Sequence, residues 1–157
     1  MLYSLTTKYA VVALVELATR SSDRPVLVKD LAAAKQIPPA FLAKLVPALV
    51  KAGILSSIRG RNGGVAFARP PMEVPLAAVV RTIEGDGYFR SCLFSLAPCD
   101  GTPNCPVHAV WGGLRDSIIR FLEQTTIGDI AGRLLPMEKR APAGGASFHN
   151  PKEEQNE

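Results

Sequence analysis

The sequence has little of several features that mark special classes of protein. Of its 157 residues only three are cysteine, two are histidine and one is tryptophan. An odd number of cysteines argues against a framework of structural disulfides. No apolar run reaches the roughly 18 residues that a membrane-spanning helix needs, and the N-terminal residues lack the pattern of a secretory signal. We therefore expect a cytoplasmic protein that does not associate with a membrane.

Sequence motifs of common enzymes are also missing. No glycine-rich phosphate loop follows a parallel strand, and there is no serine nucleophile elbow or paired acid and base. The glycines between Gly60 and Gly64 do not lie in a βαβ unit, so they are not a dinucleotide fingerprint. The sequence gives no support to an enzymatic function.

The basic charge is concentrated in one half of the chain. Hydrophobic residues make up 47% and charged residues 20%, which is ordinary for a globular protein, and the net charge is +4. Residues 1–70 contain ten lysines and arginines but only three acidic residues, whereas residues 71–157 contain eight and eleven. This asymmetry suggests a first half that binds a polyanion and a second half with another role.

Three helices are predicted in the first half. Apolar residues predict a helix over 8–20, for which Thr6 or Thr7 can cap the start. A short alanine-rich helix is expected over 29–35, followed by a turn at 36–38 and a helix over 39–52. Pro39 suits the first position of that helix and Gly53 the position just after its end. Pro47, inside the helix, is expected to remove one backbone hydrogen bond and to bend the last turns.

A β-hairpin is predicted after the third helix. Two short β-prone runs, at 54–58 and 65–69, flank a tip that contains Asn62-Gly63, a strong signal for a tight turn between antiparallel strands. An N-terminal helix, two short helices and a hairpin occur in this order in a winged helix-turn-helix domain. The second short helix would enter the major groove of DNA, and the hairpin would be the wing. The predicted DNA-binding residues are Pro39, Ala40, Lys44, Arg59, Arg61, Asn62 and Gly63.

The second half is predicted to be helical around a cysteine-containing loop. Helices are expected over 75–84, 106–125 and 126–135, with disorder from residue 140. The long helix repeats apolar residues at steps of three and four, which suits a seam between two copies of the chain or packing on its own subunit. The predicted dimer residues are Val110, Trp111, Leu114, Ile118 and Phe121. The fold class is thus mainly α with a small β-hairpin, divided into a winged helix-turn-helix DNA-binding domain (1–71), a cluster loop with a long dimerisation helix (72–139) and a tail (140–157).

The three cysteines lie within fourteen residues. Cys92, Cys99 and Cys105 have the spacing C-x6-C-x5-C, and His108 follows three residues after the last. The close C-x2-C pairs typical of zinc sites are absent. Cysteines spread through a loop can surround an iron–sulfur cluster, and His108 is the nearest candidate for a fourth ligand. A metal-free thiol switch, zinc and inert cysteines remain the alternatives.

Three segments resemble one family. The helix end LVKAGIL (49–55), the wing RGRNGGVAFAR (59–69) and the loop end CPVHAVW (105–111) are similar to those of the bacterial winged-helix iron–sulfur regulators typified by IscR, NsrR and RirA. The resemblance runs from Leu5 to about Leu135. It implies a homodimer that binds palindromic double-stranded DNA, with a 2Fe–2S or 4Fe–4S cluster that changes the affinity for DNA.

The same resemblance implies the ligands of the cluster. Cys92, Cys99 and Cys105 match the cysteine ligands, and His108 matches a histidine ligand found in part of the family. Other members use an acidic residue near the N-terminus, where this chain has Thr6-Thr7-Lys8. The first cysteine spacing is one residue longer than in IscR, so the type of cluster does not carry over.

The sequence therefore predicts a DNA-binding regulator, with repression as the expected direction, that senses nitric oxide, iron or redox state through an iron–sulfur cluster. A thiol or zinc regulator on the same fold is one alternative. A small iron–sulfur electron-transfer protein and an accessory subunit that binds a partner through the long helix are alternatives from other classes.

Overall fold

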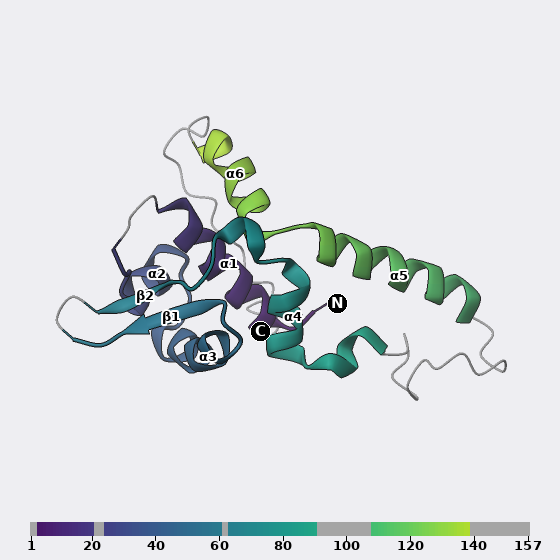
Figure 1. Ribbon diagram of the computed structural model, residues 1–157, viewed down its shortest axis with the longest axis horizontal. Helices are drawn as coiled ribbons and strands as arrows, with labels where there is room; N and C mark the ends of the chain where they lie inside the picture. The colour runs from purple at the N-terminus through teal and green to yellow at the C-terminus, as the bar shows by residue number, and fades with distance from the viewer. Residues whose placement is uncertain (1–2, 21–23, 61–62, 91–107, 139–157) are drawn as a thin grey trace, which may run out of the picture.

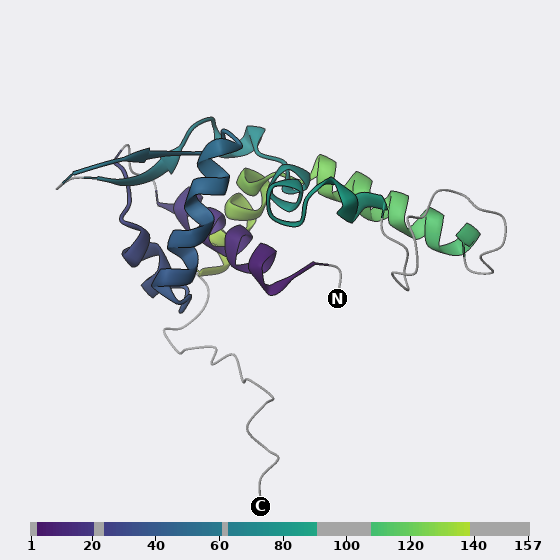
Figure 2. The same cartoon turned by 90° about the horizontal axis from the view of Figure 1, so that it is seen from below.

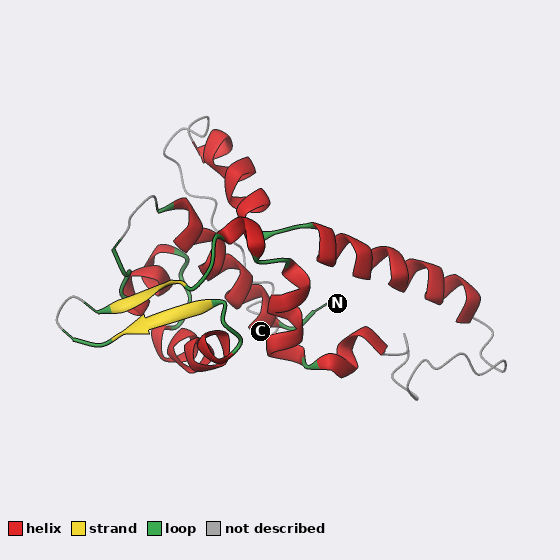
Figure 3. Cartoon of the chain, in the orientation of Figure 1, coloured by secondary structure: helices red, strands yellow, loops and turns green. Residues whose placement is uncertain are grey.

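The computed structural model describes residues 3–20, 24–60, 63–90 and 108–138. Helices dominate the described chain, and one antiparallel hairpin lies among them (Figures 1 and 3). This confirms the predicted fold class. In chain order the elements are α1 (Leu5–Thr19), α2 (Val28–Ala34), α3 (Pro39–Lys51), β1 (Leu55–Ile58), β2 (Gly64–Phe67), the 3₁₀ turn η1 (Pro71–Glu73), α4 (Leu76–Glu84), the 3₁₀ turn η2 (Asp86–Arg90), α5 (His108–Gln124) and α6 (Ile127–Glu138).

Helix α1 lies at the centre of the described chain and contacts α2, α3, α4 and α6. Its small residues Ala10 and Ala13 and its large residue Leu14 are buried, which allows neighbouring helices to approach on several sides. The helix begins three residues earlier than predicted. Its N-cap is Ser4, whose hydroxyl accepts a hydrogen bond from the backbone N–H of Thr7 at 3.2 Å. The prediction that Thr6 or Thr7 caps the helix is therefore wrong.

Helices α2 and α3 form the predicted helix-turn-helix. The N–H of Ile37 bonds to the carbonyl of Ala32 at 2.9 Å, and Gln36 closes the turn with a positive φ of 53°. The same arrangement ends α3, where Gly53 has a φ of 67° and the N–H of Ile54 bonds to the carbonyl of Leu49 at 3.0 Å. The predicted role of Gly53 is confirmed. Helix α3 continues through its internal proline to Lys51.

The hairpin pairs β1 with β2 in an antiparallel register that sets Leu55 opposite Phe67. A third segment joins its edge, because Val26 and Val65 exchange two backbone hydrogen bonds of 2.9 and 2.8 Å. The sequence pattern does not indicate this pairing. Gly64 makes this approach possible. Its φ is +150°, and a Cβ built there would lie 2.4 Å from the carbonyl oxygen of Val26.

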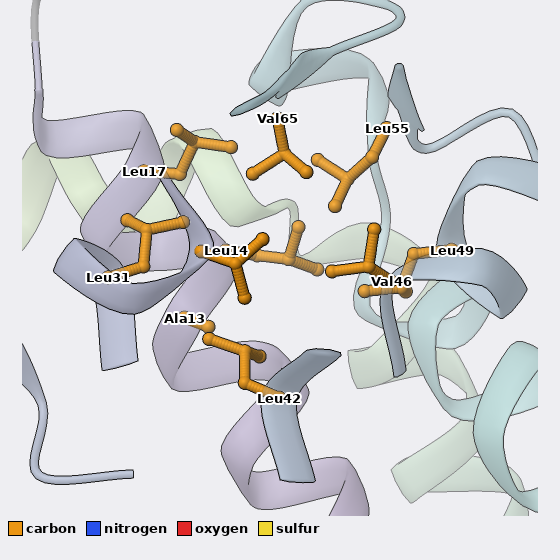
Figure 4. A pocket seen from close by; sticks show the side chains of 10 residues that line it. Ala13, Leu14, Leu17, Leu31, Leu42, Val46, Leu49, Leu55 and Val65 are labelled. Atoms are coloured by element: carbon orange, nitrogen blue, oxygen red, sulfur yellow. The ribbon is translucent and has the colours of Figure 1, made fainter. Parts of the chain in front are cut away.

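The hydrophobic core lies between α1, α2, α3 and the hairpin and continues over α4 and the junction of α5 with α6. A small apolar cavity remains at its centre, and Figure 4 shows Leu14, Leu42 and Leu49 turned toward one another there. Its lining consists wholly of aliphatic side chains, so we regard it as imperfect packing and not as a ligand site. The other lining residues are Ala13, Leu17, Val28, Leu31, Val46, Leu55 and Val65.

The start of α4 and the junction of α5 with α6 are joined by backbone hydrogen bonds. The N–H of Leu76 donates to the carbonyl of Thr125 at 2.8 Å, and the N–H of Ile127 donates to the carbonyl of Val74 at 2.9 Å. The next helix, α6, returns to pack on α1, whereas α5 extends away from the remaining helices (Figures 1 and 2).

The carboxylate of Glu84 links the end of α4 to the start of α1. Its Oε1 accepts hydrogen bonds from the backbone N–H of Ser4 at 3.1 Å and from the hydroxyls of Ser4 and Thr7. Burial would raise the pKa of Glu84, but these hydrogen bonds outweigh it and hold the pKa below its usual value. The ionised carboxylate is therefore the form that stabilises this contact.

Replacing Gly64 with alanine should destabilise the protein by about 2–4 kcal/mol. The added Cβ would collide with the backbone at Val26, and the positive φ is strained for any residue with a side chain. Denaturant unfolding would measure the change. Gly112→Ala is the matched control, because a Cβ there meets no atom within 4 Å and a helical alanine is favourable. Equal stability of Gly64→Ala and wild type would contradict the close approach.

Glu84→Gln should lower the free energy of unfolding by about 1–3 kcal/mol near pH 7, because a neutral amide accepts the three hydrogen bonds less strongly. The lowered pKa sets the pH dependence. The contribution of Glu84 is fully present above the pKa of the unfolded chain and is lost as the pH falls through the folded pKa. Unfolding curves of both proteins should therefore converge at acid pH. The exposed Glu73 provides the control substitution Glu73→Gln.

Candidate nucleic-acid interface

One face of α3 is anchored in the protein and the opposite face is exposed. Leu42 and Leu49 are buried, and the ring of Phe41 packs edge-on against Tyr9 with ring centroids 5.5 Å apart. These contacts fix the rotation of the helix about its axis. The predicted DNA-binding residues Pro39, Ala40 and Lys44 all lie on the exposed face.

The exposed face of α3 contains a further residue that the sequence analysis did not single out. Ala43 is exposed between Ala40 and Lys44. The sequence did not indicate that Ala43 is exposed, because an alanine in an amphipathic helix occurs on either face. Burial of the opposite face, seen only in the structure, identifies it.

The wing presents one of its two predicted arginines within the described chain. Arg59 follows β1 and is exposed, and Gly60 next to it has a φ of 112°. The N–H of Gly63 donates to the carbonyl of Gly60 at 2.9 Å. Gly63 is buried, and a Cβ there would meet the carbonyl oxygen of Ile58 at 2.3 Å. Gly63 therefore helps to form the turn, and its contact with DNA stays a prediction. Arg61 and Asn62 lie outside the described residues.

An acidic residue of the first half is neutralised inside the protein. Glu16 lies 2.8 Å from Nε of Arg20 and 3.1 Å from Nζ of Lys35, so it ties α1 to the end of α2. Burial would raise the pKa of Glu16, but the hydrogen bonds and charges of both cations outweigh it and lower the pKa. Because the charge of Glu16 is paired in this way, the exposed cations Lys44 and Arg59 contribute to a net positive field around α3 and the wing.

The three cysteines lie outside the described residues, and so do residues 106 and 107 of the predicted long helix. The segment that holds them begins after Arg90, at the end of η2, and ends before His108, the first residue of α5. The side chain of His108 is half-buried. The described residues contain no group of three or more possible metal ligands. Within the described chain the structure places only the last of the four predicted ligands.

The predicted dimer residues lie on α5, and most of them are exposed. The exposed fractions of Val110, Leu114 and Phe121 are 79%, 54% and 57%. Trp111 is half-buried, and Ile118 packs partly against the core of its own chain. The helix thus presents an apolar stripe beside residues that anchor it to its own chain. No helix among the described residues has the length and apolar character to span a membrane.

The C-terminal end of α5 is attached to α4 by a charged contact. Arg81 of α4 lies 3.4 Å from Glu123 of α5. Its guanidinium also lies 4.8 Å from the centre of the Phe89 ring in η2. Arg81 therefore contacts both elements that flank the cysteine segment. The sequence gave no signal for this role, because Arg81 and Glu123 are 42 residues apart along the chain.

Comparison with known proteins agrees with this geometry. A helix-turn-helix transcriptional regulator of Mycobacterium tuberculosis is 41% identical over 137 residues, which cover 87% of this chain and 84% of that protein. The transcriptional regulator IscR of Photorhabdus laumondii is 31% identical over 148 residues, covering 88% of this chain and 90% of IscR. The solved structure of CymR, the global cysteine regulator of B. subtilis, superposes with a TM-score of 0.69 at 25% identity, covering 83% of this chain and 95% of CymR.

These relatives are transcriptional regulators and not enzymes, which confirms the predicted absence of an enzymatic function. They place the chain in the class of DNA-binding regulators and set aside the electron-transfer and accessory-subunit alternatives. The family described as Rrf2, iron-dependent transcriptional regulator, matches residues 3–133. The chain belongs to the Rrf2 family of transcriptional regulators.

Proposed function

We propose that the protein is a cytoplasmic, homodimeric repressor whose affinity for a palindromic operator depends on an iron–sulfur cluster held by Cys92, Cys99, Cys105 and His108. The observation that carries the proposal is the position of the cysteine segment. It joins η2, which contacts Arg81, to His108 at the start of α5. Along the chain, the segment therefore connects the half that contains the DNA-binding elements to the helix proposed to form the dimer.

The donor set fits such a cluster. Three thiolates and one imidazole are ligands that both 2Fe–2S and 4Fe–4S clusters accept. When bound, the cluster would supply a centre that iron supply, oxidants or nitric oxide can alter. The first turn of a helix also favours thiolate at residues close before it, and Cys105 lies three residues before His108.

Contacts of α4 can transmit a change in the cysteine segment to the DNA-binding half. Arg81 contacts Glu123 and Phe89, and one turn later Glu84 holds the start of α1. A shift of α5 would therefore act on α4 and, through it, on α1. Two states of the segment alter DNA affinity only to the extent that operator DNA binds one of the two conformations more tightly.

A second candidate is a thiol regulator that uses the same fold without metal. The similarity to the global cysteine regulator CymR favours it. In this candidate the cysteines change between thiol and oxidised states. The DNA interface of α3 and the wing is the same as in the first candidate.

Native mass spectrometry after anaerobic purification, with counts of iron and acid-labile sulfide, tests the sensor. We expect a dimer that carries inorganic sulfide. The two histidines of the chain give a matched pair of variants: His108→Ala should lower the cluster content or speed its loss, and His149→Ala should not. A dimer with intact thiols and no sulfide, even after reconstitution with iron and sulfide, would refute the cluster and support the thiol candidate.

Arg59→Ala and Arg61→Ala should each weaken operator binding and reduce the slope of log K against log salt concentration by about 1, because each removes one phosphate-neutralising charge. Fluorescence anisotropy at several salt concentrations would measure both effects. Arg133→Ala, at an exposed position on α6, is the control and should keep the wild-type slope. Unchanged affinity of both wing variants at every salt concentration would remove the wing from the interface.

A further inference from the structure

The N-terminal half of α3 exposes very few groups that can hydrogen-bond a base. In this fully described helix the exposed residues of the first two turns are Pro39, Ala40, Ala43 and Lys44. The first three have apolar side chains without a donor or acceptor. Lys44 is therefore the one side chain in this part of α3 that can donate a hydrogen bond to DNA.

The major groove offers both kinds of partner. Each thymine presents its C5-methyl group, which contacts apolar side chains such as alanine, and each guanine presents the acceptors O6 and N7, which lysine binds. A face with methyl groups and a single ammonium can therefore distinguish thymine and guanine. It lacks the amide or carboxylate groups that recognise adenine or cytosine directly.

We propose that the protein reads its operator mainly through methyl contacts of Ala40 and Ala43 with thymine, and that Lys44 selects one guanine beside them. This inference rests on the proposed function, because it concerns how the operator is recognised. The electrostatic part of the affinity comes from exposed cations such as Arg59 and does not depend on sequence.

The spacing of the two alanines limits where the thymines lie. Three residues of α-helix rise about 4.5 Å, and successive base pairs are about 3.4 Å apart. The contacted thymines therefore lie within two base pairs of each other in each half-site. Lys44 follows Ala40 by about one turn, so its guanine lies next to this pair.

The test replaces thymine with uracil, which removes the C5-methyl group and keeps base pairing. The operator is first selected from random duplexes, and each thymine is then replaced in turn. We expect two adjacent or nearly adjacent positions in each half-site to lose about fourfold in affinity per methyl group, which corresponds to about 0.8 kcal/mol. Unchanged affinity after replacement of every thymine in both strands would overturn the proposal.

The contribution of Lys44 is tested with 7-deazaguanine, which lacks the N7 acceptor. Replacement of the contacted guanine should weaken binding of the wild type about tenfold, and it should have little further effect on Lys44→Ala. Lys51→Ala is the matched control, because Lys51 is exposed at the other end of α3 and should leave the guanine preference unchanged. A guanine preference that persists in Lys44→Ala would contradict the assignment.

The proposed function and the readout by α3 can fail separately. If no duplex binds more tightly than random DNA, the proposed function itself is wrong. If a selected operator binds specifically but is insensitive to both base analogues, the protein regulates through DNA and only the readout by α3 is wrong.

Discussion

The burial of α1 is the constraint on which the other elements depend. Four helices contact it, and Ala10 and Ala13 keep its surface small enough for them to approach closely. Charged contacts fix the helix as well. Glu84 of α4 holds its first turn, and Glu16 near its other end holds Lys35 at the end of α2. Because α3 and the hairpin share the core that α1 builds, its position determines which face of α3 is left exposed.

Helix α5 is attached to the protein near its C-terminal end. Leu122 is 4% exposed, and Ile118 packs partly on the core, whereas Val110 and Leu114 toward the other end are exposed. Burial and backbone hydrogen bonds therefore hold one end, and the apolar stripe continues along the part that extends away (Figure 2). Val110 and Leu114, which belong to the surface proposed for the dimer, therefore lie on the part of α5 that packing within one chain leaves exposed. This arrangement also puts His108, next to the cysteine segment, at the end of α5 farther from that attachment.

The candidate interface combines general attraction to DNA with groups that can read its sequence. Arg59 carries a charge that attracts any DNA, the alanines of α3 offer only shape and methyl contact, and Lys44 adds a charge that can also donate a hydrogen bond to a base. Much of the interface was predictable from sequence, because exposure of Ala40 and Lys44 follows from the apolar stripe that buries Leu42 and Leu49. The burial of Gly63 was not predictable, because a glycine beside asparagine marks a turn without showing which of its atoms face inward.

Local patterns in the sequence are enough to predict the elements and their order. Periodicity located the helices, Gly53 marked the end of α3, and the Asn62-Gly63 pair located the hairpin, because each of these signals depends on neighbours within a few residues. Tertiary structure alone decided which residues those elements bring together. Ser4 and not a threonine caps α1, and Glu84 binds it from 80 residues away, since a carboxylate has no sequence pattern that names a distant partner. The pairing of Val26 with Val65 likewise depends on the folded core, which brings the two backbones within hydrogen-bonding distance.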